Sequence, residues 1–155
     1  FLDPTADPYG AGLNTIQARI AVGSGGVVGR GLFEGPQTQG GFVPVNDSDF
    51  VFSVAAEELG LVGGLLLLML LALVLWRGLR IAFEARDMFG RLIAVGVVAW
   101  FALQSFENIG MNLGVMPVTG VTLPFVSYGG SSMIAAWLGI GLLQLVRLTS
   151  APPPR

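Results

Sequence analysis

The sequence contains no cysteine, no histidine and no lysine, and only 12% of its residues are charged. Without cysteine there are no disulfides and no thiol chemistry. Without histidine the chain lacks the commonest metal ligand and the commonest general base near neutral pH. Acid–base chemistry therefore falls to Asp, Glu, Tyr or Arg. The net charge of −2 is too small to indicate a partner, and nothing in the composition favours nucleic acid.

What the chain does have is apolar surface: 53% of its 155 residues are hydrophobic, and the mean hydropathy is +0.73. A soluble domain carries about twice as much charge. The composition is therefore typical of a membrane protein. The first residue is Phe and no signal peptide follows it, so we expect a fragment, the C-terminal part of something longer.

Three uncharged stretches, 59–76, 92–106 and 131–146, suggest membrane helices, the second of which reaches Met116 if Glu107 is tolerated within it. Pro117 and Pro124 interrupt the apolar sequence between the second and the third. The sequence thus predicts an all-α polytopic membrane protein in which a large extracytoplasmic loop precedes three transmembrane helices.

Arginine placement predicts the orientation of these helices. Four of the eight arginines lie in the link after the first helix, and Arg147 and Arg155 follow the third. The positive-inside rule puts these basic segments in the cytoplasm. The expected segments are an extracytoplasmic loop (1–49), a transmembrane helix (50–76), a cytoplasmic link (77–91), a second transmembrane helix (92–116), an extracytoplasmic or re-entrant loop (117–130), a third transmembrane helix (131–147) and a cytoplasmic tail (148–155).

Residues 1–50 hold ten of the 23 glycines. Within them Leu13, Ile16 and Ile20 stand at helical spacing, which predicts a short amphipathic helix at the membrane interface. The following "GSGGVVGRG" has two interpretations, a flexible bend or a loop whose neighbouring arginines contact lipid phosphate.

Small and polar residues also occur inside the predicted membrane helices. Gly60 with Gly64, and Gly110 with Gly114, form GxxxG pairs, which favour close helix packing. Three polar residues near the end of the second helix are candidates for a polar cavity. Glu107 marks either function or a place near the headgroups, whereas Asn108 and Asn112 share a face and either line a cleft or bond across helices.

Acidic residues gather where the first membrane helix begins, in "NDSDFVFSVAAEELG". Asp47 and Asp49 precede the helix, and either fits an N-cap, where a carboxylate meets free N–H groups. Catalysis and cation binding are the other two interpretations of these acids.

Taken together, the long motifs resemble the RodA/FtsW/SpoVE family, also called SEDS proteins. The resemblance rests on "FLDPTADPYGAGLNTIQARIAVGSGGVVGRGLFEGPQTQ", "SDFVFSVAAEELGLVG", "WRGLRIAFEARD" and "NIGMNLGVMPVTGVTLPFVSYGGSS", and "GRGLFEGPQTQ" is closer to the RodA branch. It implies the C-terminal part of a peptidoglycan glycosyltransferase of about ten helices in the bacterial cytoplasmic membrane. Such an enzyme polymerises lipid II beside a class B penicillin-binding protein.

The resemblance also implies roles for single residues. Asp49 matches the family's essential acid, although the usual Glu and His of that motif are Val45 and Asp47 here. We expect Asp49 to be the catalytic base. Further candidates are Arg19 and Arg30 for the substrate pyrophosphate, Gln39, Ser127 and Tyr128 for other substrate contacts, and a divalent cation held by Asp47 and Asp49.

Two other functions compete with the enzyme. A lipid II flippase would use the interrupted region 117–130 and Glu107. A non-catalytic scaffold for a penicillin-binding protein would depend on helix faces and not on Asp49.

Overall fold

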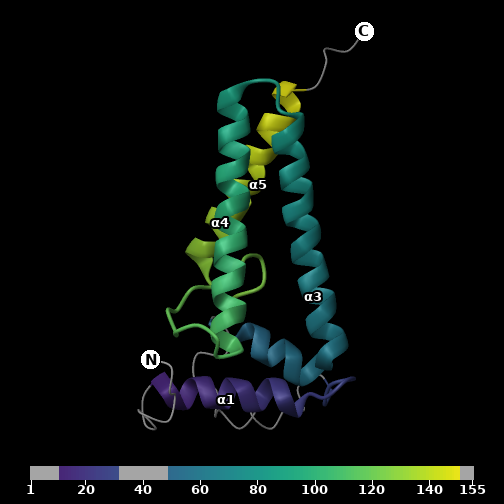
Figure 1. The fold of residues 1–155 in the computed structure, drawn as a ribbon, viewed down its shortest axis with the longest axis vertical. Helices are drawn as coiled ribbons and strands as arrows, with labels where there is room; N and C mark the ends of the chain where they lie inside the picture. Colours follow the sequence, from purple (N-terminus) through teal and green to yellow (C-terminus); the bar gives the residue numbers. More distant parts are fainter. Residues whose placement is uncertain (1–10, 32–48, 151–155) are drawn as a thin grey trace.

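The computed structural model describes residues 11–31 and 49–150, and there the chain is helical, without strands. The helices are α1 (Ala11–Ser24), α3 (Val51–Glu84), α4 (Met88–Asn112) and α5 (Gly130–Ser150). Figure 1 shows α3, α4 and α5 as three long helices, with α1 lying across one end of them. By length and composition these three are able to cross a membrane. The predicted all-α membrane fold is therefore confirmed.

The link between the first two long helices is much shorter than the predicted 77–91. α3 continues to Glu84 and α4 begins at Met88, which leaves only residues 85–87 between them. Leu, Arg, Ala and Glu dominate the end of α3, and all are good helix formers. Asp87 then starts α4, because its carboxylate accepts a hydrogen bond from the amide of Gly90 at 2.6 Å. We call this end of the bundle the link end, and the other the α1 end.

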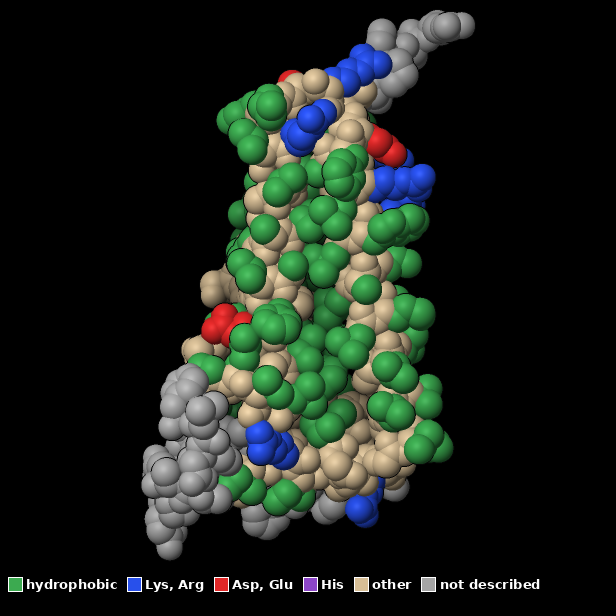
Figure 2. Space-filling view, viewed as in Figure 1, with side chains coloured by type: hydrophobic (Ala, Val, Ile, Leu, Met, Phe, Trp, Pro, Cys, Tyr) green, Lys and Arg blue, Asp and Glu red, His purple; other side chains and the backbone are tan. Residues whose placement is uncertain are grey.

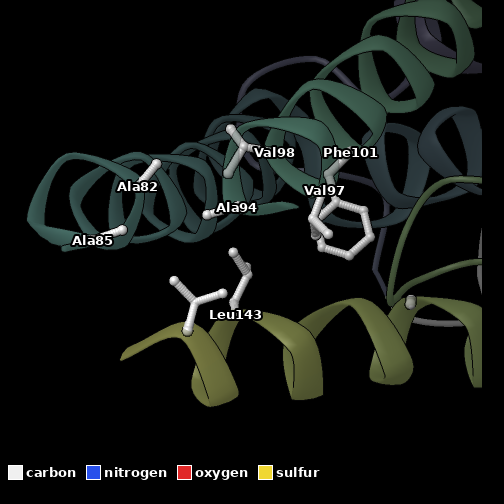
Figure 3. Packing of buried hydrophobic residues seen from close by; sticks show 9 residues of the cluster. Ala82, Ala85, Ala94, Val97, Val98, Phe101 and Leu143 are labelled. Atoms are coloured by element: carbon white, nitrogen blue, oxygen red, sulfur yellow. The ribbon is translucent and has the colours of Figure 1, made fainter. Parts of the chain in front are cut away.

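The three long helices pack through small residues. The core cluster includes Ala82, Ala94, Val98, Phe101 and Leu143, all of them labelled in Figure 3. Two glycines face this core: a Cβ on Gly78 would lie 2.5 Å from a methyl of Val98, and one on Gly139 would lie 2.9 Å from the Phe101 ring. Close helix approach thus depends on glycines outside both GxxxG pairs.

Neither GxxxG pair mediates helix packing as predicted. Gly60 and Gly114 both have positive φ angles, 68° in each case. Gly60 interrupts α3, and Gly114 follows the end of α4. The space a Cβ would need at Gly114 is taken by the guanidinium of Arg19. These glycines serve breaks and ends of helices, where the left-handed backbone region favours glycine.

Apolar side chains also cover the outside of the bundle. Figure 2 shows hydrophobic side chains over the length of the long helices, with basic side chains at the link end and also at the α1 end. Leu65, Met69 and Leu73 on α3, and Trp137 and Leu145 on α5, are examples of exposed residues. In water such a surface would be unusual, whereas in a bilayer it is the expected lipid-facing or helix-facing surface.

The backbone of α3 is broken at Gly60, and the segment 25–31 caps both sides of the break. Figure 1 shows the chain changing direction there. On one side, carbonyls that have lost their helical partners accept from amides of this segment; on the other, the first amides of the next helical stretch donate to its carbonyls. The bonds are Arg30 N to Glu57 O (3.1 Å), Gly31 N to Glu58 O (3.1 Å), Leu61 N to Gly26 O (2.9 Å) and Val62 N to Val27 O (3.2 Å).

The glycine-rich segment is therefore a structured cap, and its glycines are needed for close contact. A Cβ on Gly29 would lie 2.1 Å from the carbonyl oxygen of Glu58, and one on Gly25 would lie 2.0 Å from that of Ala56. Helix ends leave backbone groups unpaired, which a membrane protein must satisfy internally. Neither of the two interpretations offered for "GSGGVVGRG" included this role.

The predicted helix in the first loop is present as α1, and small residues form the face that packs against the bundle. Ala18 and Ala21 are buried against Phe50 and Val118. Ile20 is 48% exposed. The small alanines allow α1 to lie close to the bundle, and the larger apolar side chain points away from it. Leu13 has a side chain outside the described set.

Candidate functional site

The candidate site lies at the α1 end, around Asp49. Phe50, the next residue, is the N-cap residue of α3 and is buried, so Asp49 stands one position before the cap. Its side chain is half-buried. A Cβ built on Gly120 would lie 3.5 Å from Asp49 Oδ2, which places the loop 117–129 beside the carboxylate.

Asn112 of α4 supplies the cap of α3 from outside that helix. Its Oδ1 accepts from the amide of Ser53 at 3.1 Å and from the Ser53 hydroxyl at 2.6 Å. Its Nδ2 donates to the backbone carbonyl of Asp49 at 3.1 Å. The N-cap interpretation of Asp49 is therefore wrong, because Phe50 occupies that position and Asn112 binds the amide that a cap would bind.

Asn108 holds two backbone segments together. Its Nδ2 donates to the carbonyl of Asp49 at 3.0 Å and to the carbonyl of Val121 at 2.7 Å. Asn108 and Asn112 both have 0% relative exposure. Of the two interpretations of this pair, bonding between segments is the one the contacts support.

Gln104 extends the same pattern by one more turn. Its Nε2 donates to the carbonyl of Thr122 at 2.9 Å and to the Thr122 hydroxyl at 3.2 Å. Gln104, Asn108 and Asn112 stand four residues apart on one face of α4, and we call them the amide row. The row satisfies backbone carbonyls of non-helical segments packed against a membrane helix, where water cannot serve them. The sequence analysis did not single out Gln104, although its position four residues before Asn108 places it on the same helix face.

The loop 117–129 is fixed by its own contacts as well. The buried hydroxyl of Ser127 accepts from the amide of Leu123 at 2.7 Å. Phe125 has a φ of 67°, which is rare for an aromatic residue. Its ring makes edge contacts with Phe101 and Trp137, with centroids 5.2 and 6.1 Å apart. Tyr128, by contrast, is 85% exposed. Of the two candidates in this loop, Ser127 thus supports the loop from within, and Tyr128 presents its side chain outward.

Both candidate arginines bind the carboxyl ends of helices. Arg19 donates through Nε to the carbonyl of Leu113 at 3.0 Å and through Nη2 to that of Gly114, at the end of α4. Arg30 donates through Nε to the carbonyl of Ser24 at 3.0 Å, at the end of α1. A cation stabilises the negative end of a helix dipole. Both side chains are exposed and retain further N–H groups beyond these bonds.

Glu57 is the buried acid of the cluster, with 0% exposure. The hydroxyl of Ser24 donates to its Oε1 at 3.3 Å. Sequence reasoning counted Glu57 among the acids without assigning it a role, and the glutamate lies where the segment 25–31 meets α3. Glu107 is half-buried. Gln39, Val45 and Asp47 lie outside the described residues. Within residues 11–31 and 49–150, no three acidic side chains gather as a metal site.

Fold and site together define an α-helical membrane protein with a fixed acidic residue at one end of its helices. Residues 1–151 match the family model FtsW/RodA/SpoVE, described as cell cycle protein. The chain belongs to this family, as its motifs predicted.

Relatives with assigned names agree with the family match. The chain is 50% identical over 146 residues to the peptidoglycan glycosyltransferase MrdB of Escherichia coli K12, a match that covers 94% of this chain and 40% of MrdB. It is 46% identical over 143 residues to the stage V sporulation protein E of Bacillus subtilis, covering 92% of this chain and 39% of that protein. The chain therefore spans about two fifths of the length of these relatives.

A solved structure shares the fold. The structure is described as "Structural coordination of polymerization and crosslinking by a peptidoglycan synthase complex". The matching chain in it is 38% identical to this protein, and the two superpose with a TM-score of 0.79. The match covers 96% of this chain and 40% of that one.

Proposed function

We propose that this chain is the C-terminal part of a peptidoglycan glycosyltransferase that polymerises lipid II during cell elongation. The 50% identity to a protein named for this activity carries the proposal. The geometry at Asp49 supports it, because Asn108 and Asn112 bind the backbone carbonyl of that acid and the next residue, Phe50, is buried at the start of a membrane helix. The lipid tail of such a substrate lies in the bilayer and its sugars lie just outside, so the reacting groups meet a residue at this depth.

In the proposed reaction, Asp49 is the general base. Its carboxylate takes the proton from the attacking sugar hydroxyl of one lipid II molecule. The oxygen of that hydroxyl then forms a bond to the anomeric carbon of the growing glycan. The bond from this carbon to the lipid pyrophosphate breaks, and the pyrophosphate leaves with the electron pair. General base catalysis contributes about 10²–10⁴-fold to such steps.

The proposal assigns the negative charge of the departing pyrophosphate to cations at the α1 end. Arg19 and Arg30 are exposed and have N–H groups beyond their bonds to helix carbonyls, so both are candidates to bind pyrophosphate. A divalent cation at Asp47 and Asp49 is the alternative. Gln39 and Tyr128 are further substrate-contact candidates, whereas Ser127 contributes indirectly through the loop.

The proposed setting is the bacterial cytoplasmic membrane, with the α1 end outside and the link end in the cytoplasm. Arginines at residues 77–91 favour this orientation. The proposed partner is a class B penicillin-binding protein, which would cross-link the new strands. A fold match to a chain of a peptidoglycan synthase complex supports such a partner.

The test uses the full-length protein that carries this chain, purified with its penicillin-binding partner whose cross-linking site is blocked. Labelled lipid II is added and the glycan polymer is measured. We expect Asp49→Asn to lower polymer formation by at least about 10²-fold, because the amide cannot accept the proton. Asp87→Asn at the link end is the matched control. It should keep wild-type activity, because Asn caps helices as well as Asp.

The outcomes separate the three functions. Polymer from wild type and from Asp87→Asn, with none from a folded Asp49→Asn, supports the glycosyltransferase. Equal polymer from Asp49→Asn removes this residue from the mechanism. If even the wild type makes no polymer, the same preparation is tested for lipid II translocation in vesicles, where activity would favour the flippase and its absence the scaffold.

A further inference from the structure

The carbonyl of Asp49 is held by two buried amides from a different helix. It lies before the N-cap residue Phe50, whose own carbonyl accepts the helical amide of Val54 at 3.2 Å. Asn108 and Asn112 donate to the Asp49 carbonyl at 3.0 and 3.1 Å. Since both amides are fully buried, neither bond is exchanged easily for one to water, and the backbone of Asp49 is fixed relative to α4.

Asn108 differs from its neighbours in the amide row because it binds both sides of the site. One N–H of its amide goes to Asp49 and the other to Val121. Gly120, next to Val121, is the loop residue beside the Asp49 carboxylate. A single planar group thus sets the distance between the backbone that carries the acid and the loop that faces it.

We propose that Asn108 is a positioning residue for glycosyl transfer, which sets the distance between the Asp49 carboxylate and the loop 117–129. This inference rests on the proposed function of Asp49. Asn108 does not touch the reacting atoms; it acts through the two carbonyls that it binds. Displacing a catalytic group by about 1 Å lowers a rate by roughly 10²-fold. The loss therefore falls on kcat, whereas KM for lipid II changes little.

The test compares three variants of the full-length protein with its partner. Asn108→Asp keeps the shape of the side chain but removes its N–H donors, and Asn108→Leu removes its polarity as well. Gln104→Leu is the matched control, because it frees the same loop at Thr122 but leaves Asp49 untouched. Initial rates of polymerisation are measured over a range of lipid II concentrations, and thermal unfolding in detergent checks that each variant is folded.

We expect both Asn108 variants to lower kcat by about 10- to 100-fold with KM within about twofold of wild type. Gln104→Leu should lower kcat by less than about threefold. Equal losses from Gln104→Leu and Asn108→Leu would overturn the proposal, since Asn108 would then merely hold the loop. Wild-type kcat in Asn108→Asp, or a loss confined to KM, would overturn it as well.

Asp49→Asn is measured beside these variants to separate the two proposals. If Asp49→Asn is inactive and the Asn108 variants keep wild-type kcat, the positioning role fails and the catalytic base stands. If Asp49→Asn is fully active, the proposed base fails, and the positioning role fails with it.

Discussion

Arg19 illustrates how much one side chain does in this structure. It projects from α1, lies beside Gly114 and binds the last carbonyls of α4, so it joins the helix across the α1 end to the helix that carries the amide row. The bonds replace the N–H partners that a helix lacks at its carboxyl end. Arg19 therefore has a structural role whether or not it also binds pyrophosphate.

This role predicts the effect of Arg19→Ala. We expect the variant to lose about 1 kcal/mol of stability, because two exposed hydrogen bonds and a favourable helix-end charge disappear. Thermal unfolding in detergent measures the change. KM for lipid II is measured with the same preparation. An increase of about tenfold or more in KM would support pyrophosphate binding. An unchanged KM would limit Arg19 to the helix end, and unchanged stability would contradict its structural role.

Residue-scale predictions from sequence succeeded where partners follow from spacing. Asn108 and Asn112 share a face because they are four residues apart, and both bond to another segment. Their partner, the backbone of Asp49, is 59 and 63 residues away, and no periodic pattern encodes such a pairing. For the same reason the burial of Glu57 against Ser24 was not predictable.

At the scale of elements, α3 is two helical stretches joined at Gly60. Its φ of 68° and ψ of −164° lie in a region open almost only to glycine. A Cβ there would lie 2.3 Å from the amide nitrogen of Gly29. Hydropathy predicts the long helices. It does not predict the break, because in an apolar stretch of sequence a glycine that interrupts a helix cannot be told from one that packs against a neighbouring helix.

The break predicts a strong response to Gly60→Ala. We expect the free energy of unfolding to fall by about 1–3 kcal/mol, because backbone strain at this position adds to the clash of the new Cβ with the segment 25–31. Gly96→Ala on α4 is the matched control: nothing lies within 4 Å of its Cβ position, and the change should be neutral or stabilising by up to about 1 kcal/mol. Thermal unfolding in detergent compares them. Equal stability of the two variants would argue against a rigid break.

At the scale of the whole molecule, the two ends of the bundle differ in charge and in structure. The link end carries the four arginines of residues 77–91, whereas the α1 end carries α1, the loop 117–129 and the acids Asp49, Glu57 and Glu58 beside Arg19 and Arg30. Sequence alone predicts three crossings, which put the link 77–91 on one side of the membrane and the segments 1–49 and 117–130 on the other. It does not predict how α1 lies across the helices, because that arrangement depends on contacts such as Phe50 with Ala18.

The absence of cysteine makes the proposed orientation directly testable. Single cysteines are introduced at Thr119 in the loop 117–129 and at Met88 near the link, both exposed positions. The full-length protein carries no other cysteine in this experiment. A membrane-impermeant maleimide is applied to cells whose outer envelope layers are permeabilised and whose cytoplasmic membrane is intact. We expect Thr119→Cys to react and Met88→Cys to react only after the cytoplasmic membrane is opened. The reverse pattern would invert the topology.

The cap at Gly60 also bears on how the protein is made. The ribosome synthesises residues 25–31 before it reaches Gly60, so the capping segment exists before the helix that needs it. Until that segment is in place, the carbonyls of Glu57 and Glu58 and the amides of Leu61 and Val62 lack the partners they have in the finished fold. The helical stretches on both sides of Gly60 therefore gain these backbone partners only once the segment 25–31 lies against the break.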